Sequence, residues 1–139
     1  MSPARNVRVV LDSNAVISAL YGPGPARTVL EAVHSGEIVN VVSPFLVEEV
    51  SRALHKKLHW PIDQVIETVR TLNSLSIMVH PSKSLAVLDD VADNRILECA
   101  VAGEAAFLVT GDHALLCLNQ FEGISILPAR QFLDVLNGL

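Results

Sequence analysis

The feature that most constrains the fold is a regular alternation of short, β-branched apolar runs with segments of helical periodicity. Five such runs are predicted to be strands, at residues 7–11, 38–42, 76–79, 107–110 and 124–127. Strands that alternate with helices form a mainly parallel sheet covered on both faces. Because crossovers between parallel strands are right-handed, we predict a doubly wound α/β protein. The expected architecture is a three-layer α/β/α sandwich with a five-stranded, mainly parallel sheet.

Helices are expected between these strands, at about 15–20, 26–35, 44–58, from 61 onward, 94–102, between the last two strands, and from 128 onward. Local signals support their limits: Gly36 suits a helix C-terminus, and Ser43 with Pro44 suits an N-cap and first position. No repeat or long linker interrupts the pattern, so we predict that residues 1–139 form a single domain.

Charge and composition limit the possible functions. The net charge is −5, which argues against a nucleic-acid partner unless the acids gather at a metal site, where the cation meets the phosphate. No apolar run is long enough for a membrane span, and the start has no signal-peptide core, so a cytoplasmic protein is expected. Cys99 and Cys117 lie in apolar helical patterns and are expected to be reduced core thiols.

Acidic residues fall where an open parallel sheet places its ligands. Asp12 ends the first predicted strand, and Asp112 follows the fourth. Ligands of such sheets bind beyond the carboxyl ends of the strands, where the strand order reverses. Asp93 precedes the fourth strand and can reach the same edge, although an N-cap is the competing interpretation. A carboxylate at the end of a central strand needs a partner, and no nearby lysine or arginine offers one to Asp12.

The helix after the second strand carries adjacent glutamates. On a helical wheel, Glu49 lies at the edge of the apolar stripe, whereas Glu48 points toward Arg52 and solvent. Glu49 is therefore the one that can face a cleft, and a flank glutamate paired with an arginine is the competing interpretation. With Asp12, Asp93 and Asp112 it forms an all-oxygen set that suits Mg²⁺ or Mn²⁺.

Four segments, in this order, resemble the PIN-domain family over essentially the whole chain. They are Val9-Val10-Leu11-Asp12-Ser13-Asn14, Leu46-Val47-Glu48-Glu49-Val50, Asp93-Asn94-Arg95-Ile96-Leu97-Glu98-Cys99-Ala100 and Leu108-Val109-Thr110-Gly111-Asp112. The chain looks most similar to the single-domain prokaryotic branch that includes toxin components of toxin–antitoxin pairs. One departure is that His113-Ala114 follows Asp112, where many relatives carry another acid two residues on.

The resemblance implies a function and roles for these residues. It implies a Mg²⁺- or Mn²⁺-dependent endoribonuclease that acts on RNA. Such proteins are frequently homodimers, and a cognate antitoxin protein is a possible partner. Asp12, Asp93 and Asp112 would be the metal ligands, with Asp12 and Asp112 the principal ones and Asp93 either a ligand or a residue that positions the water. Glu49 would act at the rim of the site as an outer ligand or general base. Asn14 and Thr110 match the polar positions that orient such a site.

Basic residues could hold the substrate away from the acids. The candidates are Arg52, Lys56, Lys57 and Arg95, and a solvated helix end is the competing interpretation for the first three.

Two other functions fit parts of the pattern. One is a PIN-like module that has lost activity and binds RNA or protein. The other is a receiver-type phosphotransfer domain, which is disfavoured because the third strand ends in Val79-His80-Pro81 without an acid.

Overall fold

The computed structural model describes residues 7–138, and its centre is a six-stranded sheet in the order β3-β2-β1-β4-β6-β5. The strands are β1 (Arg8–Leu11), β2 (Val39–Val42), β3 (Ser76–Met78), β4 (Phe107–Val109), β5 (Gln120–Phe121) and β6 (Ile124–Leu127). The helices are α1 (Ser13–Tyr21), α2 (Pro25–His34), α3 (Pro44–Arg52), a π-helix (Ala53–Lys57), α4 (Ile62–Ser74), α5 (Val91–Ala102), α6 (His113–Leu118) and α7 (Ala129–Asn137).

The predicted α/β class and mainly parallel sheet are confirmed. Every strand pairing is parallel except that of β5 with β6. The sheet has six strands and not the five predicted, because Gln120–Phe121 forms a two-residue antiparallel strand. So short a segment has no apolar periodicity that a sequence pattern could reveal.

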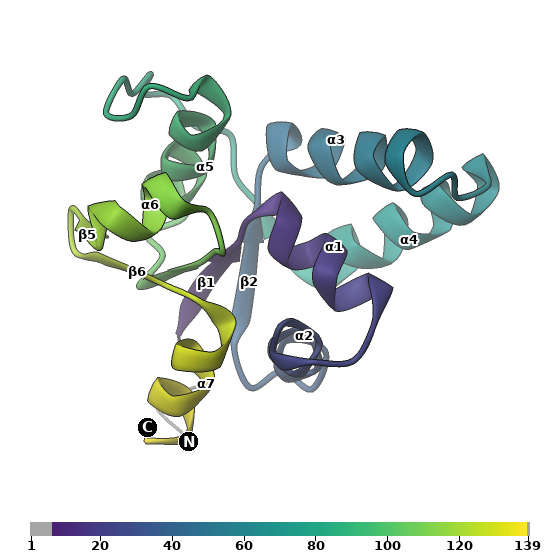
Figure 1. The fold of residues 1–139 in the computed structure, drawn as a ribbon, viewed down its shortest axis with the longest axis horizontal. Coiled ribbons are helices and arrows are strands. Elements are labelled where there is room, and N and C mark those ends of the chain that lie inside the picture. Colours follow the sequence, from purple (N-terminus) through teal and green to yellow (C-terminus); the bar gives the residue numbers. More distant parts are fainter. Residues whose placement is uncertain (1–6, 139) are drawn as a thin grey trace.

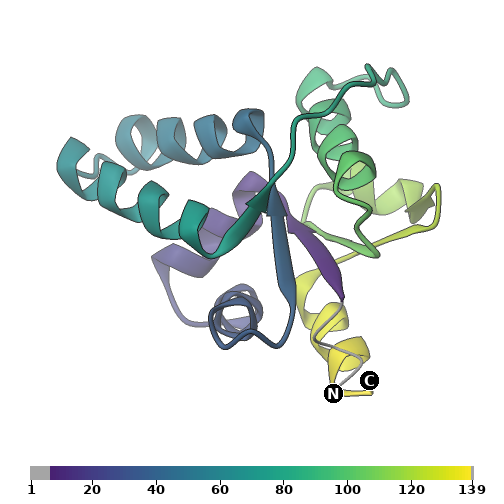
Figure 2. The same ribbon diagram turned by 180° about the vertical axis from the view of Figure 1, so that it is seen from behind.

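Helices cover both faces of the sheet (Figures 1 and 2). The alternation of β1 explains this arrangement, since successive side chains of a strand point to opposite faces. Val9 and Leu11 pack in one buried cluster with residues of α1, α2, α4 and α7, such as Phe132. Val10 packs in a second cluster with residues of α5 and α6, such as Leu97. The protein is thus the expected three-layer sandwich.

The order of the strands reverses between β1 and β4. From β1 the chain builds outward through β2 and β3, and it then returns to place β4 on the other side of β1. Leu11 and Val109 are in register at the carboxyl ends of these strands, and the amide of Asp12 donates to the carbonyl of Val109 at 3.1 Å. Residues that follow β1 and β4 therefore meet at one point on the sheet edge.

Local signals fix several helix ends as predicted. Ser43 accepts the amide of Leu46 at 3.3 Å with Pro44 in the first helical position, and Gly36 follows α2 with a φ of 80°. The prediction for Cys99 is confirmed because it is buried, but the one for Cys117 is wrong because that thiol is exposed. The short helix α6 buries Leu115 and turns Cys117 outward. None of the helices in residues 7–138 is both long and apolar enough to cross a membrane.

Candidate active site

A cavity of about 310 Å³ lies beyond the carboxyl ends of β1 and β4, where the strand order reverses. It is lined by Asp12, Ser13, Asn14, Glu49, Arg52, Ala53, Lys57, Asp90, Ala92, Asp93, Ile96 and Asp112. The structure therefore brings together the four acids singled out from the sequence, each from a different segment of the chain. Asp12 follows β1 and Glu49 lies in α3. Asp93 lies in the first turn of α5, and Asp112 follows β4.

Asp12 is the most buried of these acids, with 4% of its surface exposed. Its Oδ1 accepts the amide of Ala15 at 2.8 Å and so caps α1, and its Oδ2 accepts a hydrogen bond from the hydroxyl of Thr110. Burial raises the pKa of Asp12 above its usual range, and the charges of Asp112 and Glu49 add to that effect. The two hydrogen bonds oppose it, since they stabilise the carboxylate.

Thr110 joins the two strand ends through its hydroxyl group. This hydroxyl donates to Asp12 and accepts the amide of Asp112 at 2.9 Å. Asp112 in turn caps α6 by accepting the amide of Leu115 at 3.0 Å. Both strand-end acids are thus N-caps of the helices that follow them, which fixes their carboxylates near helix N-termini.

Asp93 lies in the first turn of α5, beside Asp112. Burial raises the pKa of Asp93 to about 6, with further contributions from the charge of Asp112 and from a side-chain hydrogen bond with it. Asp90, and not Asp93, is the N-cap of α5, where it accepts the amide of Ala92 at 2.7 Å. The N-cap interpretation of Asp93 is therefore wrong, and its carboxylate does not cap the helix.

The two glutamates of α3 point in different directions. Glu49 lines the cavity, and its Oε1 accepts a hydrogen bond of 2.6 Å from the hydroxyl of Ser13. Glu48 lies outside the cavity lining and pairs with Arg52 across one helical turn at 2.6 Å. As the helical wheel predicted, Glu49, at the edge of the apolar stripe, faces the cavity, and Glu48 does not.

Three polar residues near the site had not been singled out from the sequence. Asp90 lines the cavity as a fifth acid. Asn94 accepts the amides of Val87 and Leu88 through its Oδ1, at 3.1 and 2.9 Å. Glu98 is 7% exposed and accepts the amide of Leu85 at 2.7 Å. Polar residues four apart within the apolar run of α5 were the available signal, and their role is to anchor the loop before that helix.

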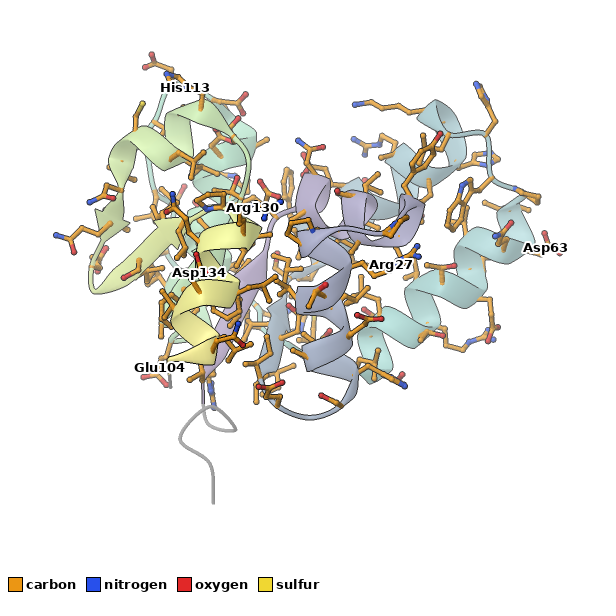
Figure 3. All side chains as sticks on the ribbon, turned by 60° about the horizontal axis from the view of Figure 1, so that its bottom comes forward. Arg27, Asp63, Glu104, His113, Arg130 and Asp134 are labelled. Carbon is orange, nitrogen blue, oxygen red and sulfur yellow. The ribbon has the colours of Figure 1, made fainter. Side chains whose placement is uncertain are left out.

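The predicted basic residues are distributed unevenly. Arg52 and Lys57 line the cavity, whereas Lys56 does not. Arg95 is mostly buried and forms an ion pair with Glu98, which occupies its guanidinium within α5. His113, directly after Asp112, projects outward from α6 in Figure 3 and does not line the cavity.

Asn14 lies between two adjoining cavities. It lines the acidic cavity and also a second one of about 330 Å³, whose wall includes Thr110 and the α7 residue Arg130 labelled in Figure 3. Asn14 is exposed and thus borders the acids at the junction of the two cavities.

The donor chemistry of the cavity suits a hard divalent cation. All five acids offer carboxylate oxygens, and burial, with the neighbouring acids adding to it, raises the pKa values of Asp12 and Asp93. Within residues 7–138, no three histidine, cysteine or acidic side chains lie close enough together to coordinate one metal ion. Mg²⁺ commonly uses one or two carboxylates and keeps several waters, so this spacing is compatible with it.

Comparisons with known proteins give a consistent result. A family profile described as "PIN domain" matches residues 8–114, a span that contains all the acids of the cavity. The chain is also similar to the "Uncharacterized protein MJ1680" of Methanocaldococcus jannaschii. The two are 29% identical over 118 residues, which cover 81% of this chain and 76% of that protein.

Proposed function

This chain belongs to the PIN domain family, and from that membership we propose that it is a Mg²⁺- or Mn²⁺-dependent endoribonuclease. The observation that carries the proposal is the cavity at the reversal of the strand order, which Asp12, Glu49, Asp93 and Asp112 line. In open α/β sheets this is the place where ligands bind. The reaction is hydrolysis of a phosphodiester bond of RNA.

Asp12, Asp93 and Asp112 would hold the cation, in part through its bound waters. When bound, it would supply Lewis-acid activation of water and neutralise charge on the phosphate. The protein itself orients the acids. The hydroxyl of Thr110 donates to Oδ2 of Asp12 and accepts the amide of Asp112. The amide of Ala15 donates to Oδ1 of Asp12, and the amide of Leu115 donates to Oδ2 of Asp112. Such fixed side chains reduce the reorganisation that substrate binding requires.

Glu49 suits the role of a general base or outer ligand at the rim. The hydroxyl of Ser13 holds Oε1, while Oε2 forms no hydrogen bond with the residues that the structure describes. That oxygen is available to take the proton of an attacking water. A positioned carboxylate of this kind typically contributes a factor of about 10²–10⁴ to the rate.

A cleavage assay tests the function. Purified protein should cut a labelled RNA slowly with Mg²⁺ or Mn²⁺ and not at all with EDTA. Ca²⁺ should bind but support little turnover, because its looser coordination positions water poorly. Asp12→Asn, purified identically as the control for contaminating nucleases, should be inactive. Wild-type cleavage by this variant would assign the activity to another site or to a contaminant.

One observation favours a second candidate, a PIN-domain module that binds RNA or protein without cleaving it. In the described part of the chain, no three side chains that could be metal ligands lie close enough together to coordinate one ion. A protein that cleaves no RNA but still gains thermal stability from Mn²⁺ would favour this module.

We further propose a biological setting for the ribonuclease. The resemblance of the whole chain to single-domain toxin components supports the toxin role in a cytoplasmic toxin–antitoxin pair, with a cognate antitoxin as protein partner. Exposed apolar side chains on α4, Ile62 and Ile66, support a homodimer. Finding a small gene for a DNA-binding protein next to this one would strengthen the toxin role, and co-purification of the two products would test it.

A further inference from the structure

The segment after Glu49 contains a π-helical turn that changes which lysine faces the acidic cavity. We propose that Lys57 binds a phosphate group of the RNA at this cavity, and that the π-helical turn Ala53–Lys57 is the device that places it there. The proposal rests on the proposed ribonuclease function, because it names the residue that holds the substrate of that site.

The turn contains one residue more than an α-helix would. The amide of Leu58 donates to the carbonyl of Ala53, five residues back, at 3.1 Å. In an α-helix the same amide would bond four residues back, to Leu54. Residues at the end of the turn are therefore shifted by one position relative to the helix face on which Glu49 lies.

This shift exchanges the two lysines. On an uninterrupted α-helix, Lys56 would lie seven residues after Glu49 and share its face. With the additional residue, Lys57 takes that place. The cavity lining shows the shifted register, since it includes Glu49, Arg52, Ala53 and Lys57 but not Lys56.

Neighbouring contacts hold the turn in this form. Leu54 is fully buried in the core, and its carbonyl accepts the amide of Trp60 at 2.9 Å. The Nδ1 atom of His55 lies 3.1 Å from the carbonyl of Trp60. Such π-helical turns are rare and occur frequently at functional sites, and this one forms the last turn of its helix, with Leu58 as the C-cap.

Within residues 7–138, Lys57 is the basic residue of the cavity wall that forms no ion pair. The cavity wall contains five acids and two basic residues, Arg52 and Lys57. Arg52 is paired with Glu48, whereas Lys57 takes part in no ion pair among the residues that the structure describes. A lysine ammonium is a compact charge with three donors, which suits a phosphate oxygen.

Binding of a short fluorescein-labelled single-stranded RNA, followed by anisotropy in Ca²⁺ over a series of salt concentrations, tests the proposal. Lys57→Ala should weaken binding about tenfold, as expected for one charge-assisted hydrogen bond. It should also reduce the salt slope by about 0.7, the value for one phosphate contact on a single strand. Lys56→Ala removes the same charge one residue earlier and should lose less affinity, with its salt slope close to that of wild type.

Deletion of Lys56 provides an independent variant. It removes the residue that the π-helical turn accommodates, so an α-helical segment would then bring the remaining lysine to the cavity while Leu54 and Leu58 keep their places. This variant should keep wild-type affinity and the wild-type salt slope. Equal losses for Lys56→Ala and Lys57→Ala, or no measurable RNA binding by wild type, would overturn the proposal.

The ribonuclease function and the role of Lys57 can be contradicted by different results. Lys57-dependent RNA binding without metal-dependent cleavage would contradict the ribonuclease but keep the role of Lys57. Metal-dependent cleavage with no difference between the two lysine variants would do the reverse. A purely structural role of Lys57 would lower the melting temperature of Lys57→Ala without changing the salt slope, and the same preparations report both quantities.

Discussion

The hydroxyl of Thr110, at the end of β4, donates a hydrogen bond to the carboxylate of Asp12, at the end of β1. The same oxygen accepts the amide of Asp112. One buried hydroxyl thus couples the two strand-end acids that line the cavity, although they are 100 residues apart in sequence.

Replacement of this hydroxyl tests its role. Thr110→Val keeps the shape of the side chain but leaves the amide of Asp112 without its acceptor and removes a donor from Asp12. We expect a loss of about 1–3 kcal/mol in the free energy of unfolding, together with reduced cleavage. Thr110→Ser retains the hydroxyl and should recover most of both quantities. Chemical denaturation of the three proteins measures the difference, and an undestabilised Thr110→Val would show that the bridge contributes little.

The twin glutamates of α3 form an internal control for the active site. Glu49→Gln should reduce the cleavage rate by about 10²-fold or more, because the amide cannot accept a proton from water. Glu48→Gln disrupts only an exposed ion pair with Arg52, which contributes about 0–1 kcal/mol, and should cleave like wild type. Single-turnover rates with saturating Mn²⁺ compare the two. Equal losses, or a loss confined to Glu48→Gln, would contradict the assignment of Glu49 to the cavity.

The stability of the metal-free protein should depend on the ionisation of Asp93. Its pKa rises from the ordinary 3.8 to about 6 on folding, so the folded state holds the proton more tightly than the unfolded chain. The stability from this group is fully present below pH 3.8 and is lost as the pH rises through about 6. Asp12, whose pKa is also raised, acts in the same direction.

The measurement is the melting temperature of wild type minus that of Asp93→Asn, in EDTA, as a function of pH. This difference should become more negative between pH 3.8 and about 6 and then level off. A difference that stays constant over this range would show that Asp93 titrates normally in the folded protein.

The homodimer prediction can be tested on α4. Ile62 and Ile66 lie one turn apart and are 54% and 51% exposed, so together they offer an apolar surface for a second copy. Light scattering should give a dimer for wild type at tens of micromolar. Ile66→Lys should shift the equilibrium to the monomer without changing the melting temperature of a single subunit. A monomeric wild-type protein would contradict this prediction.

Much of the fold follows from local patterns in the sequence. The run of Val9, Val10 and Leu11 predicts a central strand because both faces of the sheet must be covered, and Ser43 with Pro44 marks the start of α3. The positions of Asp12 and Asp112 follow from the same reasoning, since strand ends are the least ambiguous points of a parallel sheet. The side on which Glu49 lies follows from helical periodicity alone.

Other features depend on tertiary contacts that no short pattern contains. Asp89, Asp90 and Asp93 lie close together in sequence around the start of α5, and only the fold shows that Asp90 caps the helix while Asp93 lies beside Asp112. The π-helical turn defeats a regular helical wheel, so periodicity could not separate Lys56 from Lys57. Cys117 has apolar neighbours in sequence, yet α6 is so short that only Leu115 is buried.

The central claim is that the cavity beyond β1 and β4 binds a divalent cation. The most direct measurement is an anomalous difference map from crystals grown with Mn²⁺, with Asp12→Asn crystals as the control. The account predicts a peak in wild type within direct or water-bridged reach of Asp12 and Asp112, with direct oxygen ligands at roughly 2.0–2.2 Å, and a weaker or absent peak in the variant. A wild-type map without a peak in this cavity, at Mn²⁺ concentrations that support cleavage, would contradict it.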